Sequence, residues 1–476
     1  MANPPSQALL DALEQRLGPR GFTREAAAME PWMTDWRRRY HGRAAALLSP
    51  ASVEEVQAVV SLCAREGVPL VPQGGNTSMV GGATPDRDGT SLLLSLRRMN
   101  AIRSASAEEN ALVAEAGVIL THVHEAAEAI GRRFPLSLGA KGSATIGGLV
   151  STNAGGTQVL RFGPMRSLVL GLEAVLPDGS RVDALSALRK DNRGYDLKQL
   201  MIGAEGTLGI VTAASLRLVP GVGSKATAWV GIGSPADALP LLRRAEDRLG
   251  EGVETFEIVP DDVLRLVLEH IPGTRDPLAE PHAWNVLIEV TGRPGGAPAS
   301  EGLEAFLAEE LEQGRVEDAF IAASEAQAES LWRLRDSIAE AERHSGPSVK
   351  HDISVPVSRL PAFVVEASEA LPRRFPGTTI IAFGHLGDGN LHFNVQAPPG
   401  EDGARWLRET GPDATRMVHD LVTAGGGSIS AEHGIGQARL DELQRTLDPT
   451  RLAAQRAIKA ALDPAGIMNP GKLLGA

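Results

Sequence analysis

Hydrophobic residues recur at two different spacings along the chain, which predicts a mixture of helices and strands. Between residues 53 and 63 apolar side chains recur at helical spacing, and Ser52 with Glu55 matches the capping box that begins a helix. Short apolar runs such as 68–72 and 91–96 predict buried strands. Together these patterns predict an α+β fold.

The distribution of glycine divides the chain into two parts. Short strands alternate with glycine-rich loops from about residue 44 to 222, and the glycine loops become rarer after that point. At 476 residues, the chain has room for two or three domains. We therefore expect a helical lead-in at 1–43, a first domain at 44–222, a second α+β domain at 223–434, and a C-terminal segment at 435–476 that returns to the first domain.

Composition and charge exclude several classes of protein. The net charge of -12 argues against a nucleic-acid binder, although a few local cations could still hold an anionic substrate. No apolar run is long enough to span a membrane, and the first residues lack the pattern of a secretory signal. Cys63 is the single cysteine, which excludes a disulfide within the chain. We therefore expect no membrane span and a cytoplasmic location.

Two loops concentrate glycine, at residues 74–82 (GGNTSMVGG) and 142–157 (GSATIGGLVSTNAGGT). Successive N–H groups in such loops form a concavity that binds anions such as a pyrophosphate. Neither loop matches a P-loop or the dinucleotide fingerprint of a Rossmann unit. Either loop alone could be an ordinary turn, but two in one domain, together with residues 190–212, favour ligand binding.

These segments resemble the FAD domain of the vanillyl-alcohol oxidase flavoprotein family, in which the first loop wraps the pyrophosphate. The resemblance implies a two-subdomain FAD-binding domain of the vanillyl-alcohol oxidase type and an α+β substrate domain with an antiparallel sheet. It also implies non-covalent FAD, because the first loop lacks the histidine that carries the flavin covalently in some relatives. The residues that the resemblance assigns to the cofactor are Pro72, Gly74, Gly75, Asn76, Thr77, Ser78, Gly139, Ser143, Ala144, Thr145, Gly147, Gly148, Asn153, Gly155, Glu205, Gly206, Gly209, Ile210 and Asn469.

The segment FGHLGDGNLHFN (383–394) predicts a β-hairpin with a two-residue turn at Asp388-Gly389. Such a turn would set His385 directly opposite His392, with the two Cβ atoms roughly 5 Å apart on one face of the sheet. Two imidazoles in this arrangement could share one metal ion.

The hairpin alone does not complete a metal site, since catalytic zinc usually takes three protein ligands. Glu432, in the segment AEHGIG, could supply a carboxylate, and Asn394 returns to the face of the two histidines. A structural histidine pair with Glu432 on a solvated turn is the alternative. HLGDGNLHFN and SAEHGIG, however, resemble the C-terminal domain of D-2-hydroxyglutarate and D-lactate dehydrogenases. This resemblance implies that His385, His392 and Glu432 hold a divalent metal, commonly zinc. It also implies that His433 contacts the substrate as the general base.

Two cations are candidates for binding a substrate carboxylate. Residues 324–344 predict a helix whose apolar face includes Arg335, and Glu342 on the same side could be its structural partner. Lys350 lies in an alternating segment, where an exposed lysine at a strand edge is the ordinary explanation. In D-2-hydroxyglutarate dehydrogenases both positions match residues that bind the substrate carboxylate. The residues that we assign to the substrate are Arg335, Lys350, Asn394 and His433.

The resemblance predicts a metal-assisted dehydrogenase that transfers a hydride from a D-2-hydroxy acid to FAD. QGGN at 73–76 favours D-2-hydroxyglutarate, but Ala339 stands where the mammalian-type enzymes carry a hydroxyl residue. D-lactate or another short D-2-hydroxy acid, a flavoprotein subunit of an electron-transfer complex, and a flavoprotein without net redox chemistry like the ether-lipid synthase relatives are the alternatives. The sequence leaves oxygen, a quinone and an electron-transferring flavoprotein open as the acceptor; we expect one of the latter two, because relatives of this branch are mostly dehydrogenases, and we expect a homodimer.

Overall fold

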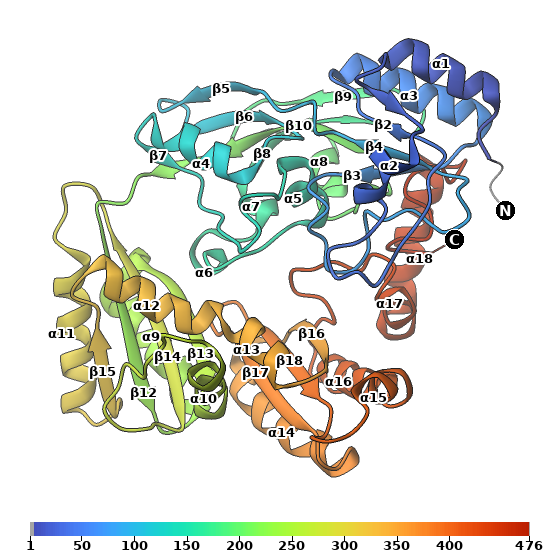
Figure 1. Cartoon of the computed structure of the whole chain (residues 1–476). Helices are drawn as coiled ribbons and strands as arrows, with labels where there is room; N and C mark the ends of the chain where they lie inside the picture. The colour runs from blue at the N-terminus through green and yellow to red at the C-terminus, as the bar shows by residue number, and fades with distance from the viewer. Residues whose placement is uncertain (1–3, 476) are drawn as a thin grey trace. The chain divides into compact units, whose positions relative to one another are not determined.

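The structure is a computed structural model that describes residues 4–475 (Figure 1). The chain forms two compact units. Unit 1 contains the residues up to Gly156, Phe162–Pro220 and the residues from Glu432 onward, and unit 2 contains Thr157–Arg161 and Gly221–Ala431. The protein is α+β, as the sequence predicts, and each unit has its own sheets and core.

The first sheet of unit 1 has the strand order β1-β2-β4-β3. Apolar side chains of two helices, α1 and α3, pack against it. The elements are α1 (Gln7–Leu17), β1 (Phe22–Thr23), α2 (Ala26–Met29), β2 (Leu47–Leu48), α3 (Val53–Glu66), β3 (Leu70–Gln73) and β4 (Leu92–Ser95). The predicted capping of α3 is confirmed, because the Ser52 side chain accepts a hydrogen bond from the Glu55 N–H at 3.3 Å.

The second sheet of unit 1 is antiparallel, with the order β5-β6-β10-β8-β9. Apolar residues of α4, α5 and α7 pack against it. The strands of this sheet are β5 (Ile102–Ser106), β6 (Ala111–Glu115), β8 (Val169–Val175), β9 (Arg181–Ala184) and β10 (Ile210–Arg217). A separate two-stranded sheet pairs β7 (Arg132–Arg133) with β11 (Val219–Pro220). The helices of this part of unit 1 are α4 (Leu120–Glu128), α5 (Ile146–Thr152), α7 (Met165–Leu168), α8 (Leu197–Met201), α17 (Leu440–Thr446) and α18 (Pro449–Leu462). The short segment α6 (Val159–Phe162) spans the junction of the two units.

Unit 2 is built on a seven-stranded antiparallel sheet with the order β15-β12-β14-β13-β17-β18-β16, which confirms the predicted antiparallel sheet. The strands are β12 (Ser224–Ile232), β13 (Val253–Pro260), β14 (Trp284–Gly292), β15 (Asp318–Ile321), β16 (Ser348–Ser354), β17 (Thr379–His385) and β18 (Asn390–Gln396).

Helices cover both faces of this sheet. Alternate residues of a strand point to opposite faces, and here the side chains on both faces are apolar and buried. Ala228 and Val230 of β12 belong to one core, with α9 (Pro235–Leu249), α11 (Ala299–Glu312), α14 (Leu360–Arg374), α15 (Gly403–Glu409) and α16 (Gly411–Ala424). Trp229, between them in sequence, belongs to the other core, with α10 (Asp261–His270), α12 (Glu325–Asp336) and α13 (Ile338–Ser345).

The single helix predicted over 324–344 is wrong, because the segment forms two helices, α12 and α13, separated at Ser337. Serine is a weak helix former that is common at helix ends, since its hydroxyl competes for backbone hydrogen bonds. The apolar spacing that predicted one helix continues across the interruption and therefore does not reveal it.

Candidate functional site

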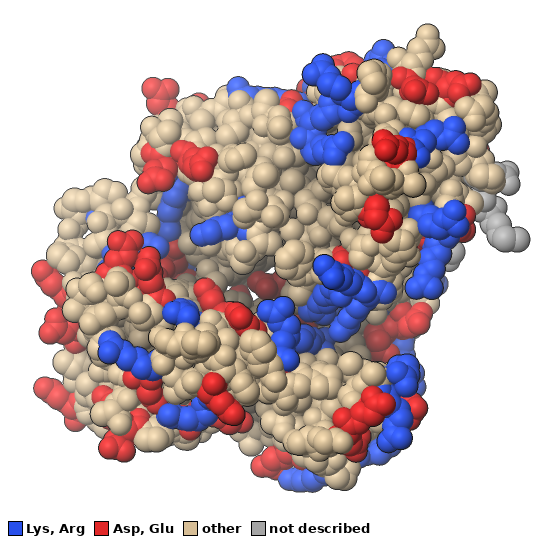
Figure 2. Space-filling view, in the orientation of Figure 1, with Lys and Arg blue, Asp and Glu red and all other residues tan. Residues whose placement is uncertain are grey.

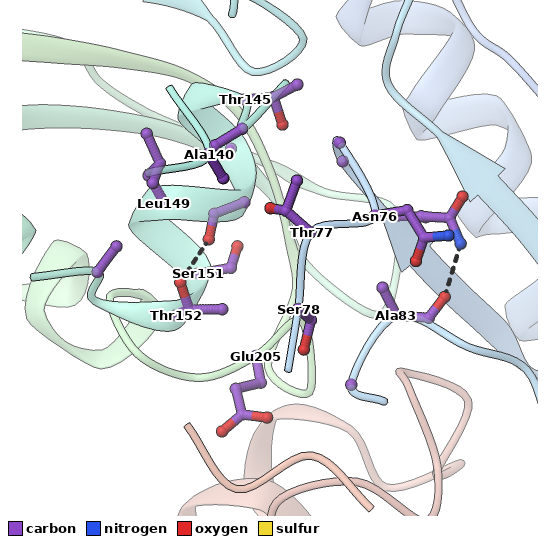
Figure 3. A pocket seen from close by; sticks show the side chains of 18 of the residues that line it. Asn76, Thr77, Ser78, Ala83, Ala140, Thr145, Leu149, Ser151, Thr152 and Glu205 are labelled. Atoms are coloured by element: carbon purple, nitrogen blue, oxygen red, sulfur yellow. Dashed lines mark hydrogen bonds between the residues drawn. The ribbon is translucent and has the colours of Figure 1, made fainter. Parts of the chain in front are cut away.

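A cavity of about 630 Å³ lies within unit 1. This volume is within the range of cofactor and small-molecule sites, roughly 300–1,000 Å³. Both glycine loops contribute to its wall, and Figure 3 shows Thr77 and Ser78 of the first loop across from Leu149 and Thr152 of α5, with Glu205 further along the wall. All residues that the sequence assigned to the cofactor line this cavity except Asn153 and Asn469.

The two exceptions hold the loops that form the wall. Asn153 ends α5 in the left-handed conformation at φ 50°, and its side chain accepts a hydrogen bond from the Arg166 N–H at 2.9 Å. The Asn469 amide is buried and donates to the carbonyl oxygens of Gly82 at 3.0 Å and of Glu205 at 2.7 Å. The structure therefore gives both asparagines a supporting position.

The cavity fits a large ligand with many polar atoms. The two glycine loops touch, since a Cβ added to Gly75 would lie 1.9 Å from the carbonyl oxygen of Ser143. Only a residue without a side chain permits this approach, which brings the backbones of both loops to the cavity wall. The Thr145 hydroxyl, also on the wall, is buried and lacks a hydrogen-bond partner among the described residues. Because buried hydroxyls are usually satisfied, this oxygen indicates a ligand atom beside it.

Glu205, in the segment 190–212, is hydrogen-bonded to the loop that carries His433. Its backbone is left-handed at φ 51°, and its buried carboxylate accepts hydrogen bonds from the N–H groups of Ile435 at 2.8 Å and Gly436 at 2.7 Å. Burial raises the pKa of Glu205, and the two N–H groups act in the opposite direction. Glu432 and His433 themselves line the cavity of unit 1.

In unit 2, the predicted register of the histidine hairpin is wrong. β17 and β18 pair His385 with Asn390 and Phe383 with His392, so the connection has four residues, 386–389, rather than two. The Leu386 N–H donates to the carbonyl of Phe256 in β13 at 3.1 Å, which keeps this residue beside β13 instead of opposite β18. Turn residues alone cannot predict this contact, because it joins segments that are far apart in the sequence.

The two histidines still share one face of the sheet, because the register differs from the predicted one by two residues and side chains alternate with period two. Their ring centroids lie 5.9 Å apart. Glu432 belongs to unit 1 and directly follows Ala431, the last residue of unit 2 in the chain.

Glu257 in β13 is a site residue that the sequence analysis missed. It lies directly opposite His385 in the sheet and is completely buried. Its carboxylate accepts hydrogen bonds from Nδ1 of His385 at 2.5 Å and from Nε of Arg335 at 2.7 Å. Burial would raise the pKa of Glu257, but the adjacent His385 and Arg335 lower it to about 2. An acid within the apolar run VETFEIVP was the available signal, since unpaired acids are seldom fully buried.

The sequence suggested Glu342 as the partner of Arg335, but the two side chains do not pair. Glu342 lies beyond the helix interruption and accepts from Lys350 Nζ at 2.6 Å and from the Asn394 amide at 3.0 Å. Arg335 instead pairs with Glu257 and lies over the Phe383 ring at 4.8 Å. Each candidate substrate cation is thus paired with a different buried glutamate.

These cations are a local feature of an acidic chain. Acidic and basic side chains are interspersed over the face drawn in Figure 2. Lys350 lies in β16, the edge strand of the sheet, directly opposite Asn394 of β18.

None of the helices among the described residues has the length and apolar character needed to cross a membrane.

Both halves of the chain match known protein families. Residues 44–184 match the FAD binding domain, and residues 223–473 match the C-terminal domain of FAD linked oxidases. The chain is 40% identical over 466 residues to the mitochondrial D-2-hydroxyglutarate dehydrogenase of Bos taurus, covering 98% of this chain and 83% of that protein. It is 39% identical to the Arabidopsis thaliana mitochondrial enzyme of that name (96% and 80% covered) and 38% identical to the D-2-hydroxyglutarate dehydrogenase of Xanthomonas citri pv. viticola (97% and 96%).

Solved structures share the fold at lower identity. p-Cresol methylhydroxylase superposes with a TM-score of 0.74 at 16% identity, covering 100% of this chain and 99% of that one. An alkyldihydroxyacetonephosphate synthase superposes with a TM-score of 0.73 at 18% identity, covering 99% and 87%. At such identities the likeness establishes the fold alone.

These relatives contradict the expected cytoplasmic location, since the Arabidopsis and Bos proteins are mitochondrial enzymes. The expectation relied on the lack of a secretory signal and of a long apolar run. It was wrong because these two observations argue only against secretion and a membrane span. Other targeting segments are amphipathic and have neither feature.

Proposed function

The chain belongs to the FAD-linked oxidase family, and from this premise we propose that it oxidises D-2-hydroxyglutarate to 2-oxoglutarate. The observation that carries the proposal is identity of 36–40% over 92–98% of the chain to D-2-hydroxyglutarate dehydrogenases of plants, animals and a bacterium. The reaction removes a proton from the C2 hydroxyl and a hydride from C2. FAD, when bound, would supply the acceptor for that hydride.

We propose that the cavity of unit 1 holds FAD without a covalent bond. Its glycine loops present backbone N–H groups, which suit the pyrophosphate, and the Thr145 hydroxyl can bond a further cofactor atom. The proposed FAD-binding domain is 44–222 and the proposed substrate domain is 223–434, with 1–43 leading in and 435–476 returning to the first.

We propose a divalent metal, zinc as the first candidate, on His385, His392 and Glu432. Imidazole and carboxylate are ligands that zinc takes, and three of them would leave a position for substrate. A bound zinc ion acts as a Lewis acid, which would lower the pKa of the substrate hydroxyl. Support comes from the two rings on one sheet face and from the Glu257 carboxylate on Nδ1 of His385.

The remaining polar residues would bind and deprotonate the substrate. His433 is the proposed base for the hydroxyl proton, since a neutral imidazole accepts protons near neutral pH. Arg335 and Lys350 are proposed to bind a carboxylate, Arg335 through the guanidinium nitrogens that do not face Glu257. Asn394 lies opposite Lys350 in the sheet and would donate a further hydrogen bond. We also propose an electron-transferring flavoprotein or a quinone as the acceptor, and a homodimer.

A D-lactate dehydrogenase is the second candidate. The chain is 32% identical over 473 residues to a putative mitochondrial D-lactate dehydrogenase of Schizosaccharomyces pombe, covering 98% of this chain and 87% of that protein. Ala339, which cannot donate a hydrogen bond from its side chain, weakens the argument for a second carboxylate on the substrate. An ether-lipid synthase function has only the fold likeness in its favour.

An anaerobic flavin assay tests the proposal. The FAD-loaded protein is mixed with D-2-hydroxyglutarate, its L-isomer or D-lactate, with and without a chelator, and the flavin absorbance is followed. We expect rapid bleaching by D-2-hydroxyglutarate, little by the L-isomer, and strong slowing by the chelator. Faster bleaching by D-lactate would favour the second candidate, and bleaching that the chelator leaves unchanged would remove the metal from the reaction.

A further inference from the structure

Glu257 is in contact with both halves of the proposed substrate site. One oxygen accepts from Nδ1 of His385 at 2.5 Å, and the other accepts from Nε of Arg335 at 2.7 Å. The three residues come from β13, β17 and α12, and all are largely buried. This carboxylate is therefore the shared partner of a proposed metal ligand and a proposed substrate cation.

The bond to His385 fixes which ring nitrogen carries the proton. An ionised carboxylate only accepts hydrogen bonds, so Nδ1 of His385 must be the donor. Nε2 then carries the lone pair, which is the form of imidazole that binds a metal ion. Metal-binding histidines commonly donate their second nitrogen to a carboxylate in this way, and the carboxylate orients the ring and raises its basicity.

The bond to Arg335 restricts a long side chain that would otherwise have several rotamers. With Nε bonded to Glu257 and Cζ 4.8 Å from the centre of the Phe383 ring, the side chain is held at two points. A planar guanidinium that is fixed along one edge presents its other edge for bidentate carboxylate recognition.

We propose that Glu257 is a positioning residue that orients His385 for metal binding and Arg335 for recognition of the substrate carboxylate through one buried carboxylate. This inference rests on the proposed function, since it gives both partners their roles. It predicts two separate effects of one substitution, on metal affinity and on substrate discrimination.

The alternative is that Glu257 only neutralises a buried arginine. Unit 2 contains a glutamate with that simpler arrangement: Glu310 of α11 is buried and accepts from Arg244 at 2.7 Å and from Arg315 at 2.8 Å. Glu310 belongs to neither proposed site, so Glu310→Gln is a matched control for the loss of a buried, arginine-paired carboxylate.

The experiment compares the wild-type holoenzyme with Glu257→Gln and Glu310→Gln. Glutamine keeps the volume but has one acceptor oxygen, and its amide NH₂ would face a second donor, so one of the two bonds is lost. Zinc affinity is measured by competition with a chromophoric chelator, and KM is measured with D-2-hydroxyglutarate and with D-lactate. Circular dichroism and FAD content establish that each variant is folded.

For Glu257→Gln we expect zinc affinity to fall by about 10–100-fold. We also expect KM to rise by about tenfold more for D-2-hydroxyglutarate than for D-lactate, because D-lactate lacks the second carboxylate that a misplaced Arg335 would no longer bind. Glu310→Gln should change neither quantity. If Glu257→Gln does not fold, Glu257→Asp keeps the charge but shortens the reach, and we expect the same losses to a smaller degree.

Folded Glu257 variants with wild-type zinc affinity and an unchanged KM ratio would overturn the inference while leaving the proposed function intact. Equal losses in the Glu257 and Glu310 variants would also overturn it, because they would reflect general destabilisation. A wild-type protein that binds no divalent metal would instead refute the metal site itself, and with it this role for Glu257.

Discussion

Glu205 in unit 1 and Glu257 in unit 2 are both buried glutamates that support candidate site residues, yet their surroundings act on them in opposite directions. Glu205 accepts from the backbone N–H groups of Ile435 and Gly436, and burial raises its pKa although these bonds and the charge of Arg439 act in the opposite direction. Burial would also raise the pKa of Glu257, but His385 and Arg335 lower it to about 2. The two backbone N–H groups and the charge of Arg439 do not offset the loss of water around Glu205, whereas the His385 ring and the Arg335 guanidinium more than offset it around Glu257.

The difference matters for what each glutamate can support. Glu205 holds a loop whose own N–H groups are neutral, so a protonated side chain can still accept through its carbonyl oxygen. Glu257 is the counter-ion of Arg335, and a buried cation without a counter-ion is costly. Loss of charge should therefore disturb unit 2 more than unit 1.

The largest effect is expected for Glu257→Leu. This change leaves Arg335 buried without its counter-ion and should reduce the free energy of unfolding by about 3–5 kcal/mol. The thermal melting temperature should then fall by roughly 10 °C, as measured by circular dichroism. The double variant Glu257→Leu/Arg335→Met removes the unpaired charge and should recover most of the loss. A double variant as unstable as the single one would show that burial of charge is not the cause.

A smaller, pH-dependent effect is expected for Glu205→Gln, which should lose about 1–3 kcal/mol because one of the two N–H groups of the loop loses its acceptor. A raised pKa means that the folded protein keeps its proton while the unfolded chain releases it. Wild-type stability therefore falls as pH rises from 4.5, the ordinary value, through the raised pKa. The glutamine variant lacks this titration.

Urea unfolding of the two FAD-loaded proteins between pH 4.5 and 8 measures this difference. The advantage of the wild type should be largest near pH 4.5 and should shrink as pH rises. An advantage that grows with pH would mean that the folded state favours the charged form of Glu205, contrary to the comparison with Glu257.

The smallest effect is expected for Asp191→Asn. The pKa of Asp191 is also lowered to about 2, by its hydrogen bonds with Arg193, but both side chains are exposed. Water already solvates the two charges, so the pair should contribute no measurable stability. An unchanged melting temperature beside the large change in Glu257→Leu would show that burial decides the contribution. A clear loss in Asp191→Asn would contradict this.

Local spacing determined several features correctly from the sequence. The shared face of His385 and His392 follows from strand periodicity, and it survives a register error of two residues because period two is preserved. The position of Arg335 on an apolar helix face likewise indicated that its charge must meet a partner or a ligand. The glycine loops predicted a cavity because only glycine permits such close contact between backbones.

Only the tertiary structure decided which groups meet across the fold. The four-residue connection of the hairpin depends on the bond from Leu386 to Phe256. The pairing of Arg335 with Glu257, and of Lys350 with Glu342, depends on how α12 and α13 pack on the sheet. Such pairings join residues up to about eighty positions apart, and no local period encodes them. The amino-acid sequence by itself thus determined the chemical groups and the faces on which they lie, whereas packing of the sheet and its helices decided their partners.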